Sequence, residues 1–168
     1  MGITIFISFS ILCFYKYFKK FPSNYIILSI YTICHSYLIA SISTLYDEES
    51  ILISFGCTLG MFFALSLYAC FTKTDYTILG GFICSFIMMI LLFLILFSFV
   101  FKILNLAICC IMISLLSVFI VYDTQIIIGG KHKAKRLSLN DYCIAAIIIY
   151  TDVLSLFLQI LGLCGAKE

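Results

Sequence analysis

The sequence contains few charged residues: lysine, arginine, aspartate and glutamate make up only 11% of its 168 residues. Soluble domains carry roughly twice that share, and the mean hydropathy of +1.23 is typical of an integral membrane protein. Pro22 is the single proline, and no low-complexity stretch is present. Linkers and disordered tails are therefore excluded, and residues 1–168 are predicted to form one transmembrane domain.

An excess of basic charge is also missing. The formal net charge is +2 at pH 7, and the basic residues lie between apolar runs, which excludes nucleic acid as a partner. Nine cysteines are present without a single CxxC pair, and only His35 and His132 are available as histidine ligands. Neither a zinc site nor a tightly bound cofactor is expected, and the cysteines are interpreted as small buried hydrophobes.

Long apolar runs dominate the sequence, and about 20 apolar residues suffice to cross a bilayer as a helix. Because the runs lack the alternation of a spanning β-barrel, the predicted fold class is an all-α polytopic membrane protein with about six transmembrane helices. The first run has no A-x-A-like cleavage site, and its lysines follow the apolar residues instead of preceding them. We therefore expect a retained helix and not a signal peptide. The predicted spans are residues 2–18, 24–45, 51–71, 78–101, 104–128 and 142–163.

The loops between these runs predict the orientation in the membrane. Basic residues cluster at 16–20 and 131–136, whereas the loop at 47–49 is acidic. Lysine and arginine favour the cytoplasmic side, so the first, third and fifth loops are predicted to face the cytosol.

Two aspartates lie inside apolar runs, Asp123 in IVYDTQIII (120–128) and Asp152 in IIIYTDVLSLFL (147–158). An ionised aspartate near the bilayer centre costs on the order of 2.5–3.5 kcal/mol on the insertion scale, so such residues usually bind a proton, a cation or a basic partner. Apart from Lys16 near the end of the first span, no lysine or arginine occurs within the spans to serve as that partner.

The two aspartates are predicted to face each other, because their helices are consecutive and antiparallel. Two close carboxylates cannot both ionise easily, and hard oxygen donors suit calcium, so the pair is predicted to be a proton-sensing site that binds Ca²⁺ transiently. Each aspartate could instead serve only helix packing. The polar residues expected to support the pair are Tyr122, Gln125, Tyr150, Ser155, Gln159 and His35.

The chain also resembles a known family. IVYDTQIII, a histidine-and-lysine loop and LSLNDYCIAAIIIYTDVLSLFLQIL (137–161) together resemble the C-terminal end of the transmembrane BAX-inhibitor motif family. The Lifeguard and Golgi anti-apoptotic branch is the most similar, since FPSNYIILSIYTICHSYLIASISTLYDEESIL (21–52) and LYACFTKTDYT (67–77) are similar to its middle helices.

The resemblance implies a seven-helix bundle of which this chain lacks the first helix. It also implies residence in the endoplasmic reticulum or Golgi and a calcium leak that suppresses cell death, with Asp123 and Asp152 as the family's pH-sensing pair. The expected partners are the lipid bilayer, Ca²⁺ as the permeating ion, and cell-death regulators. Two departures are expected: residues 1–15 hold no counterpart of the family's latch arginine, and His35 replaces an acidic residue.

Two other functions are compatible with the sequence. A non-conducting membrane adaptor would restrain cell-death proteins by contact, although it has no need of costly buried acids. An intramembrane aspartyl protease also uses two aspartates on successive helices, the first in a Tyr-Asp context like that of Asp123. Its second aspartate should follow Gly-x-Gly, whereas Ile149-Tyr150-Thr151 precedes Asp152. An enzyme is therefore not predicted.

Overall fold

The computed structural model describes residues 22–74, 76, 105–129 and 141–165. These residues form four α-helices and no β-strand. The helices contain 21 to 24 residues, which corresponds to roughly 31–36 Å at a rise of 1.5 Å per residue and suffices for the hydrocarbon core. The helices are α2 (Ser23–Ser43), α3 (Glu48–Phe71), α5 (Asn105–Ile128) and α6 (Tyr142–Cys164).

The four helices correspond to the predicted spans 24–45, 51–71, 104–128 and 142–163. The predicted spans 2–18 and 78–101 lie outside the described residues. Within the described part, four helices rather than six are long and apolar enough to cross a membrane. The largest difference in bounds is at α3, which begins three residues earlier than predicted because Glu48 and Glu49 extend its first turn. Negative side chains interact favourably with the partial positive charge of a helix N-terminus.

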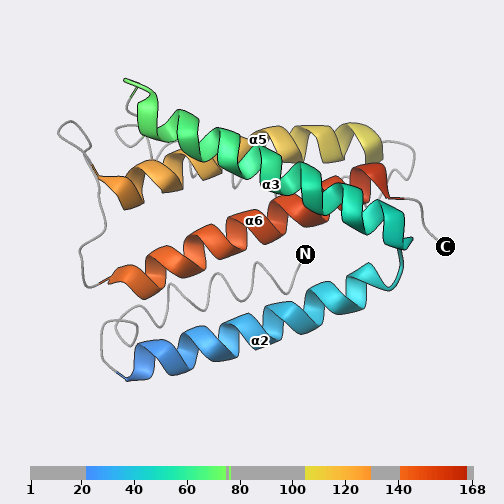
Figure 1. Ribbon diagram of the computed structural model, residues 1–168, viewed down its shortest axis with the longest axis horizontal. Helices are drawn as coiled ribbons and strands as arrows, with labels where there is room; N and C mark the ends of the chain where they lie inside the picture. The colour runs from blue at the N-terminus through green and yellow to red at the C-terminus, as the bar shows by residue number, and fades with distance from the viewer. Residues whose placement is uncertain (1–21, 75, 77–104, 130–140, 166–168) are drawn as a thin grey trace.

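Helix α6 lies at the centre of the described bundle (Figure 1). It packs against α2 on one side and against α3 and α5 on the other. Helices α2 and α6 begin at the same end of the bundle, which is also the end where α3 and α5 finish. Helices α2 and α3 are therefore antiparallel, as are α5 and α6, whereas α3 and α5 run in the same direction.

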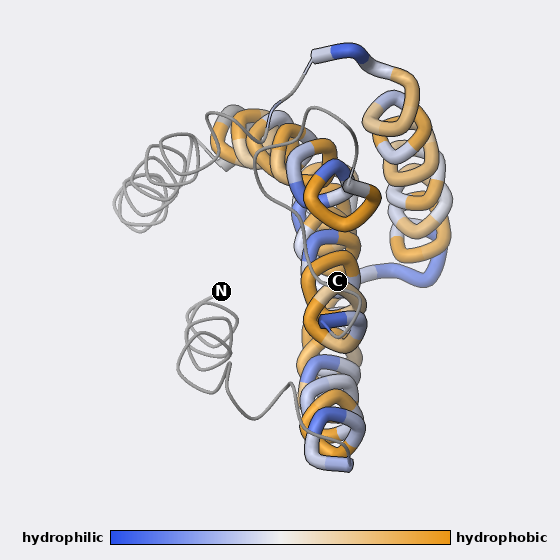
Figure 2. The backbone as a smooth tube through the Cα atoms, turned by 90° about the vertical axis from the view of Figure 1, so that its left-hand side faces the viewer, coloured by the Kyte–Doolittle hydropathy of each residue, from blue (hydrophilic) through white to orange (hydrophobic). Residues whose placement is uncertain are grey.

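The surface of the bundle is apolar, while many of its buried side chains are polar. In Figure 2, most of each helix is orange, the colour of hydrophobic residues. Large side chains such as those of Ile33, Leu52 and Phe71 are exposed. The buried residues of α3 include Ser54 and Thr58. This distribution suits a lipid environment, where apolar side chains lose nothing by exposure and small or polar side chains favour helix contacts.

Two apolar clusters hold the helices together. Between α2 and α6, Tyr31 packs against Ile144 and Ile147. Between α3, α5 and α6, the fully buried Ile120 and Leu156 pack with Ile160. Helix α6 contributes to both clusters, so it fixes the position of α2 relative to the other described helices.

The C-terminus of α5 is formed by a glycine. Gly129 has a φ of 64°, and its backbone N–H donates to the Gln125 carbonyl at 3.1 Å. This left-handed conformation is favourable for glycine and costly for residues with a Cβ atom. Gly130 lies outside the described residues.

Gln125 joins the end of α5 to the loop that follows α3. Its side chain is fully buried, its Nε2 donates to the Thr74 carbonyl at 3.0 Å, and its Oε1 accepts from the Tyr76 backbone N–H at 3.0 Å. The Tyr76 hydroxyl also lies 3.2 Å from that of Tyr68 on α3. The amide therefore satisfies two backbone groups outside any helix and attaches the loop to α5.

A pair of glycine substitutions tests this description of the helices. Gly129→Ala should lower the free energy of unfolding by about 1 kcal/mol, because alanine is strained at a positive φ. Gly60→Ala should instead raise it by up to about 1 kcal/mol, because a Cβ there meets nothing within 4 Å and alanine favours the helix. Denaturation of the detergent-solubilised protein measures both, and equal effects would contradict the assigned α5 terminus.

The role of Gln125 predicts a second stability change. Gln125→Leu should destabilise the protein by about 1–3 kcal/mol, because it removes two hydrogen bonds of roughly 1 kcal/mol each and frees the loop. Limited proteolysis should then cleave within residues 72–76 faster. Ser114→Ala is the control, since Ser114 is exposed on α5 and bonds only its own helix, donating to the Cys110 carbonyl. If Gln125→Leu were cleaved within residues 72–76 no faster than Ser114→Ala, the proposed attachment of the loop to α5 would be wrong.

Candidate functional site

Asp123 of α5 and Asp152 of α6 lie side by side in the structure. Their side chains are in hydrogen-bond contact, and the two acids interact electrostatically. Two carboxylates are both acceptors, so this contact is a hydrogen bond only when one of them carries a proton. The structure thus brings together the two acids that the sequence singles out, across the extensive α5–α6 interface.

The surroundings of the pair offer few other donors. Asp152 Oδ2 is buried and finds no hydrogen-bond donor among the described residues, and the Thr124 hydroxyl beside Asp123 is also buried without a partner. Leaving such a group unsatisfied costs roughly 1–3 kcal/mol. No lysine or arginine lies in the four described helices. A proton or a small cation is therefore the natural partner for this oxygen.

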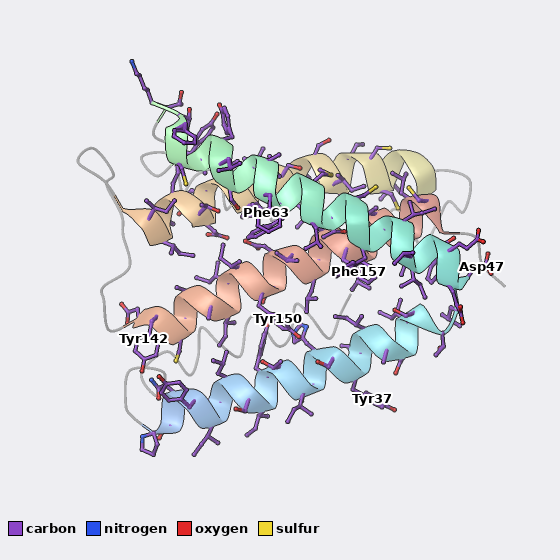
Figure 3. All side chains as sticks on the ribbon, viewed as in Figure 1. Tyr37, Asp47, Phe63, Tyr142, Tyr150 and Phe157 are labelled. Atoms are coloured by element: carbon purple, nitrogen blue, oxygen red, sulfur yellow. The ribbon has the colours of Figure 1, made fainter. Side chains whose placement is uncertain are left out.

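A second polar group occupies the interface between α2 and α6, which we call the α2–α6 seam. The Tyr31 hydroxyl lies 2.6 Å from Thr151 Oγ1. The ring of His35 lies 4.4 Å from that of Tyr31 and 6.0 Å from that of Tyr150, measured between centroids. Figure 3 shows Tyr150 projecting from α6 toward α2, whereas Tyr37 projects from the opposite side of α2. His35 is only 2% exposed, and its Nε2 has no hydrogen-bond partner within the described chain.

Three consecutive residues of α6 connect the seam to the acid pair. Successive residues of an α-helix differ in direction by about 100°. Tyr150 and Thr151 therefore face α2, while Asp152 faces α5. Tyr31 of the seam lies within electrostatic range of Asp152. One turn of α6 thus carries both polar groups.

The residues predicted to support the acids have separate positions. His35 and Tyr150 lie together in the seam. Gln125 directs both polar groups of its amide to the loop after α3. Tyr122 and Gln159 are buried, and Ser155 is partly buried on α6.

Sequence reasoning missed the partners on α2. Tyr31 binds Thr151, and Asn24 Nδ2 donates to the Tyr142 hydroxyl at 2.9 Å. A signal was present: Asn24, Tyr31 and His35 are spaced by seven and four residues, which places them on one face of a helix. They are also the buried residues of α2.

The arrangement is suited to binding protons and hard cations. Paired carboxylate oxygens can share one proton, and they can exchange it for a divalent cation with oxygen preference. His35 adds a group whose ordinary titration range lies close to neutral pH.

Comparisons with known proteins agree with the sequence motifs. The family model described as inhibitor of apoptosis-promoting Bax1 matches residues 1–168. Mouse protein lifeguard 3 is 25% identical over 156 residues, covering 89% of this chain and 50% of that protein. The human protein lifeguard 3 is 26% identical over 161 residues, covering 89% and 49%. Mouse protein lifeguard 4 is 33% identical over 142 residues, covering 83% and 57%.

The chain spans about half the length of these lifeguard relatives. No solved structure matches it significantly. The family match over the entire sequence confirms the resemblance that the C-terminal motifs indicate. The protein therefore belongs to the BAX-inhibitor family, whose model is described as inhibitor of apoptosis-promoting Bax1.

Proposed function

We propose that this protein is a pH-sensitive calcium leak channel of intracellular membranes that modulates calcium stores and suppresses cell death. The observation that carries the proposal is the contact between Asp123 and Asp152 inside a bundle with a lipid-compatible surface. Membership of a family described by inhibition of apoptosis-promoting Bax1 supports the part that concerns cell death.

The acid pair supports the coupling between protons and calcium. With one shared proton, the pair carries a single negative charge and a satisfied hydrogen bond. Loss of that proton leaves two carboxylates that repel each other and attract a divalent cation. Calcium binding therefore competes with proton binding, and the flux depends on pH.

The proposed topology has six spans, including residues 2–18 and 78–101. Helices α3 and α5 run in the same direction (Figure 1), which supports a further span between them, because one crossing returns the chain to the side where α5 begins. The first, third and fifth loops face the cytosol, which agrees with the placement of basic residues. The membrane proposed is that of the Golgi or the endoplasmic reticulum, with the bilayer, Ca²⁺ and cell-death regulators as partners. No enzymatic step is proposed.

The channel hypothesis predicts that both acids control the pH dependence of calcium flux. In the parent, apparent calcium affinity should fall by up to about tenfold per pH unit on acidification, since each retained proton must be displaced. Asp123→Asn and Asp152→Asn should each flatten this dependence, because asparagine cannot exchange a proton. A calcium-sensitive dye inside liposomes that contain the purified protein measures the flux.

Glu49→Gln is the matched control, because it removes an exposed acid in the first turn of α3, at the far end of that helix from the loop held by Gln125. It should behave as the parent does. If Asp123→Asn and Asp152→Asn both leak calcium as the parent does at every pH, the assignment of the site is wrong. A parent that does not conduct, with cell protection intact in both acid variants, would favour a contact adaptor.

A further inference from the structure

Helix α2 is attached to the described bundle mainly through α6. Most of its surface faces outward, and its buried residues are Asn24, Tyr31 and His35. Two of them bond across the α2–α6 seam, Asn24 to the Tyr142 hydroxyl and Tyr31 to Thr151 Oγ1. His35 is equally buried, yet its Nε2 has no partner in the described part of the chain. Buried polar atoms are normally paired, so this imidazole requires an explanation.

The titratable groups that face His35 are two phenols. The centroid of its ring lies 4.4 Å from that of Tyr31 on the same helix and 6.0 Å from that of Tyr150 on α6. Asp152 lies on the same turn of α6 as Tyr150, but its contact is with Asp123 of α5. No carboxylate of the described residues hydrogen-bonds Nε2. The imidazole therefore lies between aromatic rings, without a bonded anion to balance a positive charge.

These surroundings accept a neutral imidazole and disfavour an imidazolium. Protonation adds a full charge and gives Nε2 a proton to donate, with no acceptor within reach among the described residues. The faces of the Tyr31 and Tyr150 rings attract a cation, but this attraction is weaker than the hydration that a buried charge loses. The charged ring is therefore stable only where water reaches it. Histidine ordinarily titrates near pH 6.5, so mild acidification suffices to charge a hydrated ring.

We propose that the α2–α6 seam is a pH-sensitive contact, which closes around neutral His35 and opens to water when His35 is protonated. Acidification separates α2 from α6 around Tyr31 and Tyr150, so that water hydrates the imidazolium. The bond between Asn24 and Tyr142 holds the start of α2 in place. It lies about 16 Å from His35 along the helix, at a rise of 1.5 Å per residue.

The direction of the effect follows from the protons bound. The open seam binds a proton on His35 and the closed seam excludes it, so acid favours the open seam. With one proton, the ratio of open to closed seams rises by up to about tenfold per pH unit below about pH 6.5. The switch goes beyond the proposed channel, because it needs neither calcium nor the acid pair. In a conducting protein, it brings water to the turn of α6 that carries Asp152.

Two measurements on the full-length protein in liposomes test the switch. Nitrogen-15 NMR of the labelled imidazoles reports the protonation of His35, and His132→Gln removes the signal of the other histidine. Hydroxyl-radical footprinting with mass spectrometry measures how much water reaches Tyr31, which is 6% exposed in the closed seam. Between about pH 7.5 and pH 5, oxidation of Tyr31 in the parent should rise by about tenfold, in step with the imidazolium signal.

His35→Phe is the principal variant, because a phenyl ring keeps the contact with Tyr31 and Tyr150 and cannot be protonated. His35→Gln repeats the test with a polar side chain that does not titrate. Oxidation of Tyr31 should stay low and independent of pH in both variants. Phe157, another buried residue of α6, should stay protected in every protein at every pH, which separates opening of the seam from unfolding.

Three results would overturn the switch. The first is a parent in which His35 becomes charged while Tyr31 stays protected, and the second is a parent in which His35 remains neutral down to about pH 5, well below the ordinary range of histidine. The third is an acid-induced rise in Tyr31 oxidation that persists in both His35 variants, because another group would then open the seam. None of these results depends on calcium flux, so the switch and the proposed channel can fail separately.

Discussion

The hydrocarbon core of a bilayer offers no water, so every polar group within a helix must find its partner inside the protein. Serine and threonine side chains on the outer faces solve this locally. Ser29, Ser41 and Ser114 each donate to the carbonyl four residues earlier at 2.9 Å. These hydroxyls need no neighbouring helix, so they leave the packing undetermined.

Longer polar side chains cannot solve the problem locally and therefore define the helix contacts. Asn24 reaches Tyr142, Tyr31 reaches Thr151, and Gln125 reaches the backbone at Thr74 and Tyr76. Each bond joins segments about 50 to 120 residues apart in sequence. Apolar packing at Ile147 and Leu156 is compatible with many rotations of a helix, whereas these polar contacts select one.

Two buried atoms without a hydrogen-bond partner among the described residues, His35 Nε2 and Asp152 Oδ2, lie at the interfaces that α6 forms with α2 and with α5. Tyr150 and Thr151 face His35 and Tyr31, and Asp152 faces Asp123. A purely structural bundle would gain stability by replacing these groups with apolar ones. Their position links the proposed exchange of calcium and protons to the packing of α2 against α6.

The sequence predicts the class of fold, the four described spans to within a few residues and the two aspartates, because each depends on local composition. The hydropathy of a segment indicates directly whether it can cross a bilayer, and an aspartate in an apolar run can be recognised without any structure. The family also follows from ordered local motifs. The antiparallel order of α5 and α6 makes the meeting of Asp123 and Asp152 a reasonable expectation.

Other features required the tertiary structure. Gln125 lies two residues from Asp123, yet its amide binds the loop after α3. No local sequence pattern indicates whether this amide supports the acid pair or holds the loop. The importance of Tyr31 and Thr151 depends on the rotation of α2 against α6. The sequence by itself determined which segments are long and apolar enough to cross a membrane and which side chains are costly there, since transfer free energy belongs to each residue. Only the tertiary structure decided which costly groups meet, because that depends on the rotation and depth of every helix relative to its neighbours.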